Sequence, residues 1–185
     1  MAKFYDILPA NANVGEILAG VTAPAYGETL YGLVPGGKFI YCYTALTTLH
    51  QGSVVTISTD TGDTAGLNPR AVLPTTTSVY NQYGICAETK AAAGGIWVQV
   101  GGRCTHSIVD GTTDVGINDP LKPSNGSHAL VNDHADTGTA SMVAIAESAE
   151  TDTLTVQGDA TYGGQGASPQ TWNTVYLLDR WATVA

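Results

Sequence analysis

The chain has 185 residues, a length that suits one domain burying roughly 70% of the surface that its unfolded form exposes. Its net charge is −9, and its seven Lys and Arg side chains form no basic patch, which argues against binding to nucleic acids or anionic membranes. Only 12% of the residues are charged, about half the usual share, and this favours a surface that stays against neighbouring molecules.

The first residues, MAKFYDILPANANVGE, lack the basic region and the apolar core of a signal peptide. No apolar run reaches the length of about 18 residues that a membrane span needs. We therefore expect the protein to be made in a cytosol and kept there. Cys42, Cys86 and Cys104 are an odd number without a CxxC pair, so we expect three buried free thiols.

Residues 1–37 are predicted to form an extended N-terminal arm. Glycine and proline interrupt every pair of apolar residues there, so no helical period survives. Phe4, Tyr5, Ile7 and Leu8 would make an apolar patch in water that monomeric proteins seldom tolerate. We expect these four side chains to pack on another chain.

From residue 38 onward the sequence predicts a β-domain. Aromatic and β-branched residues alternate or cluster between turn residues in four short segments: 39–47, 53–59, 70–73 and 84–88. With 22 glycines and 8 prolines, no window offers good helix caps and a 3.6-residue period, apart from one turn at AETKAAA. The expected fold class is therefore all-β.

The segment GGIWVQVGG, residues 94–102, is the clearest strand in the chain. Its alternation places Ile96, Val98 and Val100 on one face, and Trp97 and Gln99 on the other. The glycine pairs at its two ends permit unusual backbone angles.

Two further segments predict strands in the second half. NDPLKPSNGSHALVND indicates two short strands about an Asn125–Gly126 turn, and TWNTVYLLDRW indicates a closing C-terminal strand. Asn125 also begins an N-glycosylation sequon, but without a secretion signal we interpret the sequon as a turn.

The segment GICAETKAAAGGIWVQVGG is repeated in degenerate form as VAIAESAETDTLTVQGD. The alignment matches Glu88 with Glu147 and, after one deletion, Val98 with Val156. Half-domains of about 60 residues have open strand edges and unfinished cores, so two of them are expected to cover one another. We predict a single domain built as a duplicated short-strand barrel or sandwich, with repeats at about 38–104 and 105–160.

Histidines and acidic residues are the candidates for chemistry. The histidines are His50, His106, His128 and His134. The last two lie six residues apart beside Asp133 and Asp136, a spacing that fits no zinc site, so we interpret them as exposed loop residues.

Asp110, Asp114 and Asp119 fall within ten residues but do not match a calcium-binding EF-hand loop, and we expect turn-forming aspartates. Glu88 and Glu147 occupy matching places in the repeat and resemble a glycosidase pair. They fit equally well as strand-end residues whose side chains cap the following turn. The sequence thus predicts no catalytic residue, no metal site and no cofactor.

The repeat and the segment between its copies, residues 84–157, resemble the β-rich decoration or cement proteins of tailed-phage capsids. The shared features are a small-apolar-Ala-Glu step, an Ala and Gly linker, and a V-x-V-x-G strand. Asn118-Asp119-Pro120-Leu121 stands where that family usually has a Gly-Asp turn. The resemblance implies a structural protein on the outer capsid surface, clustered as trimers or smaller assemblies, without an active site.

Three functions remain open at this point. The first is a virion structural protein whose partner is the major capsid protein, with Phe4, Tyr5, Ile7, Leu8, Trp172 and Trp181 as candidate interface residues. The second is a head-fibre or carbohydrate-binding module, for which Trp97, Trp172 and Trp181 are the candidate aromatics. The third is a hydrolase that uses Glu88 or Glu147.

Overall fold

The computed structural model describes the following residues: 3–7, 24–45, 49–58, 69–75, 81–90, 93–110, 114–133, 142–149, 170–179 and 181–182. Every regular element among these residues is a strand. The described part therefore contains no helix that is long and apolar enough to cross a membrane. The strands are β1 (Lys3–Ile7), β2 (Thr29–Leu33), β3 (Lys38–Thr44), β4 (Val54–Ser58), β5 (Arg70–Val72), β6 (Asn81–Cys86), β7 (Gly94–Asp110), β8 (Pro120–Pro123), β9 (Leu130–Asn132), β10 (Ala144–Ala146), β11 (Gln170–Leu178) and β12 (Trp181–Ala182).

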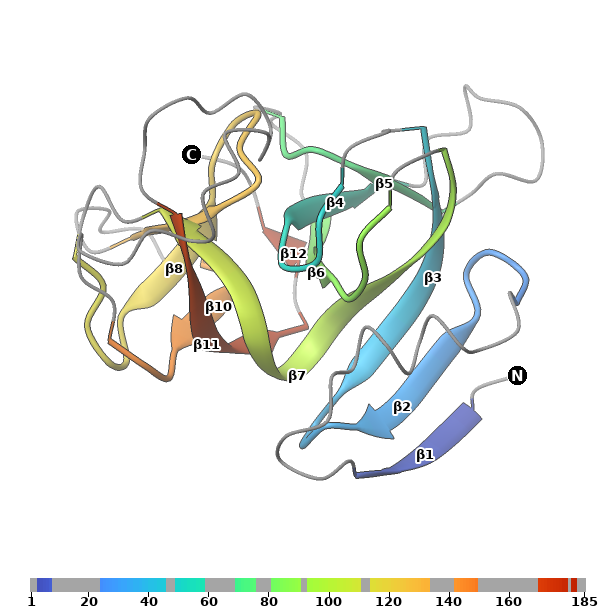
Figure 1. Ribbon diagram of the computed structural model, residues 1–185, viewed down its shortest axis with the longest axis horizontal. Coiled ribbons are helices and arrows are strands. Elements are labelled where there is room, and N and C mark those ends of the chain that lie inside the picture. Colours follow the sequence, from blue (N-terminus) through green and yellow to red (C-terminus); the bar gives the residue numbers. More distant parts are fainter. Residues whose placement is uncertain are drawn as a thin grey trace.

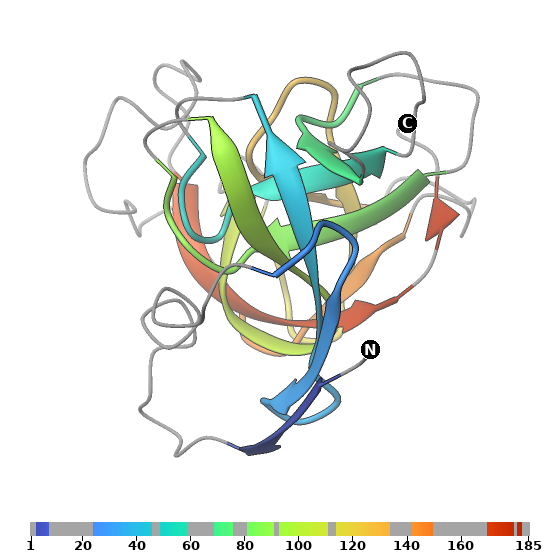
Figure 2. The ribbon, with the colours of Figure 1, turned by 90° about the vertical axis from the view of Figure 1, so that its right-hand side faces the viewer.

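Five strands close into a barrel in the order β3, β5, β4, β6, β7 and back to β3 (Figures 1 and 2). The contact between β3 and β5 is parallel, and the other four are antiparallel. The interior is filled by small and β-branched side chains: Cys42, Val55, Ile57, Ala71, Cys86, Ile96, Val98 and Val100. Because this ring of pairings is closed, none of the five strands is an edge strand within it.

A second closed circuit of pairings runs through β7, β9, β8, β10, β11 and back to β7. Here the β7–β9 contact is parallel and the other four are antiparallel. This is the pairing pattern of the first barrel, with the second half of β7 in the place of β3 and β11 in the place of the first half of β7. We call the two circuits the first and the second barrel.

The two barrels share one cluster of buried hydrophobic side chains. Val54, Tyr83 and Ile85 project from β4 and β6, and they are buried in the same cluster as side chains of the second barrel. The members from the second barrel include Leu121, Leu130, Ala144, Val175 and Leu177. Because neither barrel completes this cluster alone, the molecule is one all-β domain, and the prediction of that fold class is confirmed.

At the Ala-Glu step, the register between the two barrels differs by one residue from the predicted alignment of the repeat. The step lies at the ends of β6 and β10, which hold equivalent places in the two barrels. Val98 is buried opposite Cys86, but the residue opposite Ala146 in the second barrel is Val175 of β11. Val156, which the sequence alignment matched with Val98, lies outside the described residues. The segment between β10 and β11 is long, so the sequence alignment matched Val98 with a residue of that segment and not with Val175 of β11.

Strand β7 passes from one barrel to the other through a bend at Gly101 and Gly102 (Figure 1). Gly102 has a φ of 79°, which favours glycine, and a side chain there would collide with the backbone of Gly36. The buried amide of Gln99 donates to the carbonyls of Gly101 and Arg103 at 3.1 and 3.0 Å. These contacts fix the bend.

The predicted arm, residues 1–37, is not one element. Strand β2 pairs antiparallel with β3, and Leu30 and Leu33 are buried in a cluster with Phe39 and Trp97. Positive φ angles at Gly32 and Leu33, of 88° and 67°, end the strand and break the alternation that would have indicated it. The remaining strand, β1, pairs in parallel with β2 at the end of the strand order (Figure 2).

Candidate functional site

The candidate interface residues lie on three strands that are not neighbours. Phe4, Tyr5 and Ile7 belong to β1, while Leu8 lies outside the described residues. Trp172 is paired with Ile108 in the β11–β7 ladder, and Trp181 is paired with Gln82 in the β12–β6 ladder. None of these three strands is paired with another of the three.

An aromatic group that the sequence analysis missed lies on the outer face of β3. Tyr26 stacks on Tyr41 with ring centroids 5.5 Å apart, and it meets Tyr43 edge to face at 5.8 Å. Trp97 packs on Tyr41 at 5.0 Å, and the Arg70 guanidinium lies 5.9 Å from the centre of the Tyr43 ring. The alternation of Tyr41 and Tyr43 was the available signal, but Tyr26 fell in the predicted arm.

The tryptophan of this group cannot serve as a binding platform, because Trp97 is 1% exposed. Tyr26 and Tyr43 are only half-buried. Much of the aromatic surface is engaged within the group, since Tyr26 stacks on Tyr41 and Arg70 lies over Tyr43. The main role of these aromatic side chains is therefore packing, while part of Tyr26 and Tyr43 stays exposed to solvent.

Glu88 caps a strand. Its Oε1 accepts a hydrogen bond from the backbone N–H of Trp97 at 3.0 Å, within β7 and not in the turn that the sequence analysis expected Glu88 to cap. Burial raises the pKa of the Glu88 carboxyl, while the Trp97 hydrogen bond and the charge of Lys90 lower it in part. Burial also raises the pKa of Tyr41, and Tyr26 and Glu88 add to the effect.

Glu147 is not the structural counterpart of Glu88, which corrects the sequence alignment. In the second barrel the equivalent cap is Ser148, whose Oγ accepts from the backbone N–H of Thr174 at 3.1 Å. Glu147 instead forms an ion pair with Arg103, with 2.6 Å between Oε2 and Nε. The two glutamates therefore have different partners.

His128 is buried, which corrects the prediction that it is an exposed loop residue. Its side chain is 3% exposed, and its Nδ1 lies 3.1 Å from Ser53 Oγ. The hairpin about Asn125–Gly126, which the structure confirms, carries His128 against the start of β4. His106 is half-buried beside the hydroxyl of Thr105, and His134 lies outside the described residues.

The acidic candidates have different structural roles: Asp110 ends strand β7, opposite Gln170, and is not in the predicted turn. Asp119 Oδ2 accepts from the backbone N–H of Gly116 at 2.8 Å and from the Asn132 amide at 3.0 Å, so the turn prediction is confirmed for Asp119. Asp133 is buried and pairs with Lys122 at 3.0 Å. Within the described residues, no group of three or more His, Cys, Asp or Glu side chains is arranged to hold a metal ion.

The three thiols are free and buried, as predicted. Burial raises the pKa of Cys42 to about 12 and that of Cys104 to about 11, and it raises the pKa of Cys86 further. A thiol that stays protonated at neutral pH is a poor nucleophile and a poor metal ligand.

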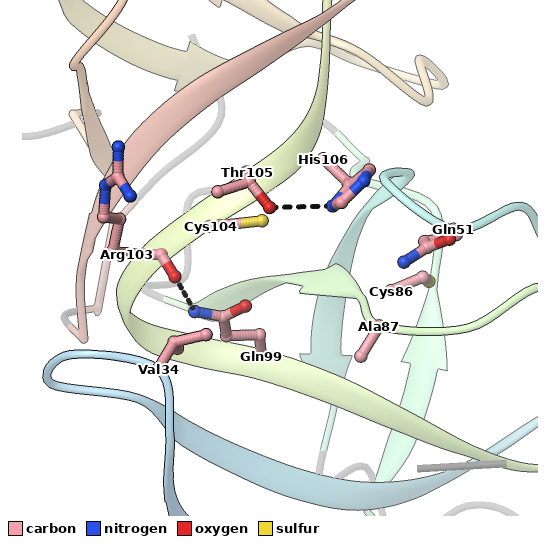
Figure 3. Close-up of a pocket in the computed structure, with 9 residues that line it drawn as sticks. All are labelled: Val34, Gln51, Cys86, Ala87, Gln99, Arg103, Cys104, Thr105 and His106. Atoms are coloured by element: carbon pink, nitrogen blue, oxygen red, sulfur yellow. Dashed lines mark hydrogen bonds between the residues drawn. The ribbon is translucent and has the colours of Figure 1, made fainter. Parts of the chain in front are cut away.

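A small cavity lies where the two barrels meet (Figure 3). It is lined by residues of the β2–β3 turn, the β3–β4 turn, β6 and β7: Val34, Gln51, Cys86, Ala87, Gln99, Arg103, Cys104, Thr105 and His106. Its volume of about 20 Å³ is enough for one water molecule and far below the several hundred Å³ of a typical ligand pocket. This cavity cannot hold a sugar or a peptide.

No protein-family model matches the chain, and no curated protein matches it in sequence.

Proposed function

We propose that this chain is a virion structural protein that binds the outer face of a tailed-phage capsid and stabilises the shell. One observation carries the proposal. Strand β1 pairs with β2 on one side, and no other described strand pairs with its second side. An open strand edge is a template on which an extended segment of another chain can add. The proposed partner is the major capsid protein, and a homotrimer is the favoured assembly.

The net charge of the chain supports a location on the outer face of the capsid. With a net charge of −9 and only seven basic side chains, the chain would be repelled by packaged DNA and suits the outside of the shell. The sequence resemblance of residues 84–157 to phage decoration proteins agrees with this location.

Co-sedimentation with expanded capsid shells that lack this chain tests the proposal. Deleting residues 1–12 should weaken shell binding at least about tenfold, because the truncation removes β1 and its apolar side chains. The truncated protein should keep the thermal unfolding midpoint of a full-length monomer, since β1 is paired with β2 alone among the described strands.

A matched control separates the edge from general surface hydrophobicity. Phe4→Ser should weaken binding, whereas Ile117→Ser should not, although Ile117 is 61% exposed at the turn before β8. Equal binding by the truncated and full-length proteins would contradict the proposal. Unfolding of the truncated protein would show that the N-terminal segment is part of the core.

The second candidate function is a head-fibre or carbohydrate-binding module. It is favoured by the half-buried Tyr26 and Tyr43 beside Arg70 on the outer face of β3. A glycan array distinguishes the two functions: binding of a sugar that is lost in Tyr43→Ser but kept in the truncated protein would favour this module. For the hydrolase alternative, the test is an activity that Glu88→Gln abolishes.

A further inference from the structure

The turn between β3 and β4, residues 50–53, is hydrogen-bonded to both barrels. The N–H of Gly52 donates to the carbonyl of Cys86 at 2.8 Å, and the N–H of Cys86 donates to the carbonyl of Ser53 at 2.8 Å. These bonds tie the turn to the end of β6 in the first barrel.

One further backbone bond of this turn, and one of the adjacent residue Val54, lead to the second barrel. The N–H of Ile108, in β7, donates to the carbonyl of Gly52 at 3.0 Å. The N–H of Val54 donates to the carbonyl of His128 at 2.8 Å. Gly52, Ser53 and His128 are all buried, so these bonds are shielded from water.

The Ser53 hydroxyl is the buried hydrogen-bond partner of the His128 ring. Ser53 Oγ accepts from the backbone N–H of His50 at 3.3 Å, and it lies 3.1 Å from His128 Nδ1. When the ring is neutral with its proton on Nε2, the hydroxyl donates its own proton to Nδ1 while it accepts from His50. Protonation of His128 places a second donor against Oγ and leaves the hydroxyl proton without its acceptor.

We propose that Ser53 and His128 form an acid-sensitive latch between the two barrels, which holds while His128 is neutral and loosens when His128 gains a proton. The latch goes beyond the proposed capsid function and does not depend on it. Its site is the contact of the turn at residues 50–53 with His128, and its action is to release the bonds of that turn to the second barrel.

The surroundings of His128 favour the neutral ring. Burial lowers the pKa of His128, and the nearby His50 lowers it further. The other titratable groups on the two strands bonded to this turn are Tyr83 and Cys86 on β6, and Arg103, Cys104, His106 and Asp110 on β7. Burial raises the pKa of the two thiols and lowers that of His106, so none of these three groups places a negative charge there near neutral pH to favour a protonated ring.

The direction of the pH effect follows from linkage. A histidine whose pKa is lower in the folded than in the unfolded state stabilises the fold fully above its unfolded pKa of about 6.5. That contribution is lost as the pH falls below this value. Acid therefore weakens the latch, and neutral pH restores it.

Hydrogen exchange of single backbone amides in the purified full-length protein tests the latch. Between pH 7 and pH 5, after correction for the intrinsic exchange rate, protection of the Val54 and Ile108 amides should fall at least about tenfold. The amide of Leu178, which donates to Val143 away from the turn, should change much less. Equal change at all three amides would overturn the proposal.

Three variants complete the test. His128→Asn keeps an acceptor near the position of Nδ1 but takes up no proton in this range, so Val54 and Ile108 should stay protected at pH 5. His106→Asn removes another partly buried histidine and should keep the wild-type response. Ser53→Ala should lower protection at both pH values. A full acid response in His128→Asn would refute the latch.

An NMR titration of the wild-type imidazoles gives a check that does not depend on any variant folding. His128 should titrate below the ordinary histidine value of about 6.5, with the loss of Ile108 protection following the same midpoint. A His128 midpoint at or above that value would overturn the proposal.

Discussion

Replacing Gly84 by alanine should destabilise the protein more than its small size suggests. Gly84 lies in β6 against β7, inside the first barrel. An added Cβ would lie 2.5 Å from Val98 Cγ1 and 2.6 Å from the backbone oxygen of Gln99. Carbon atoms in contact are normally separated by about 3.5–4.0 Å, so one strand must move by about 1 Å in a closed ring.

The expected cost follows from that displacement. Inserting a methyl group into a packed core costs about 1–3 kcal/mol, and a collision with backbone places this site near the upper value. For a domain of this size, about 3 kcal/mol lowers the melting temperature by about 6–12 °C. Urea unfolding followed by tryptophan fluorescence measures the change, since Trp97 is buried beside the barrel.

Two companion variants separate the collision from other effects. Val98→Ala alone should cost about 2 kcal/mol through lost burial and a cavity. In the Gly84→Ala background it should cost at least about 1 kcal/mol less, because it removes one of the colliding carbons. Gly116→Ala is the control: its Cβ would meet Asp119 at an ordinary 3.4 Å, and the cost should stay within about 0.5 kcal/mol. If Gly84→Ala costs no more than this control, the register between β6 and β7 is wrong.

Three further predictions concern the caps and the thiols. Because burial raises the pKa of Glu88, its charged form opposes folding above that pKa; the stability of Glu88→Gln relative to wild type should therefore increase between pH 4 and pH 7 in urea titrations, and a constant difference would contradict this. Ser148→Ala leaves the N–H of Thr174 without its cap and should cost about 1 kcal/mol in the same assay; no change would mean that this cap is not needed. Intact mass should be the same before and after reduction, and alkylation of Cys42 and Cys104 should be slow until the protein unfolds; a mass increase of about 2 Da on reduction would show a disulfide.

Local pattern predicts the strands of the first barrel well. The alternation of Ile96, Trp97 and Val98 gives the two faces of β7 as the structure has them, with Val98 inside the barrel and Trp97 against the outer cluster. The hairpin at Asn125–Gly126 follows from its turn residues. These features depend on neighbouring residues, which a single sequence displays.

Long-range packing is what the sequence could not reveal. Leu30 and Leu33 are buried beside β3, but Gly32 between them and Leu33 itself have positive φ angles, so the two leucines follow no regular period in the sequence. His128 follows a polar turn in the sequence. It is buried because the hairpin of β8 and β9, in the second barrel, places it against Ser53. The sequence alignment matched Val98 with Val156 and not with Val175 for the same reason. The strand that completes the second barrel, β11, is distant from β10 in the chain.

Because β7 runs through both barrels, the backbone of this strand fixes the distance and the angle between them. There is no linker: the last strand of the first barrel becomes the first strand of the second at Gly101 and Gly102. A force applied to one barrel is therefore transmitted to the other through a continuous strand and its hydrogen-bond ladders, and no flexible segment lies between them. The molecule should behave as a rigid spacer, and its halves cannot be expressed separately without cutting through a strand that both require.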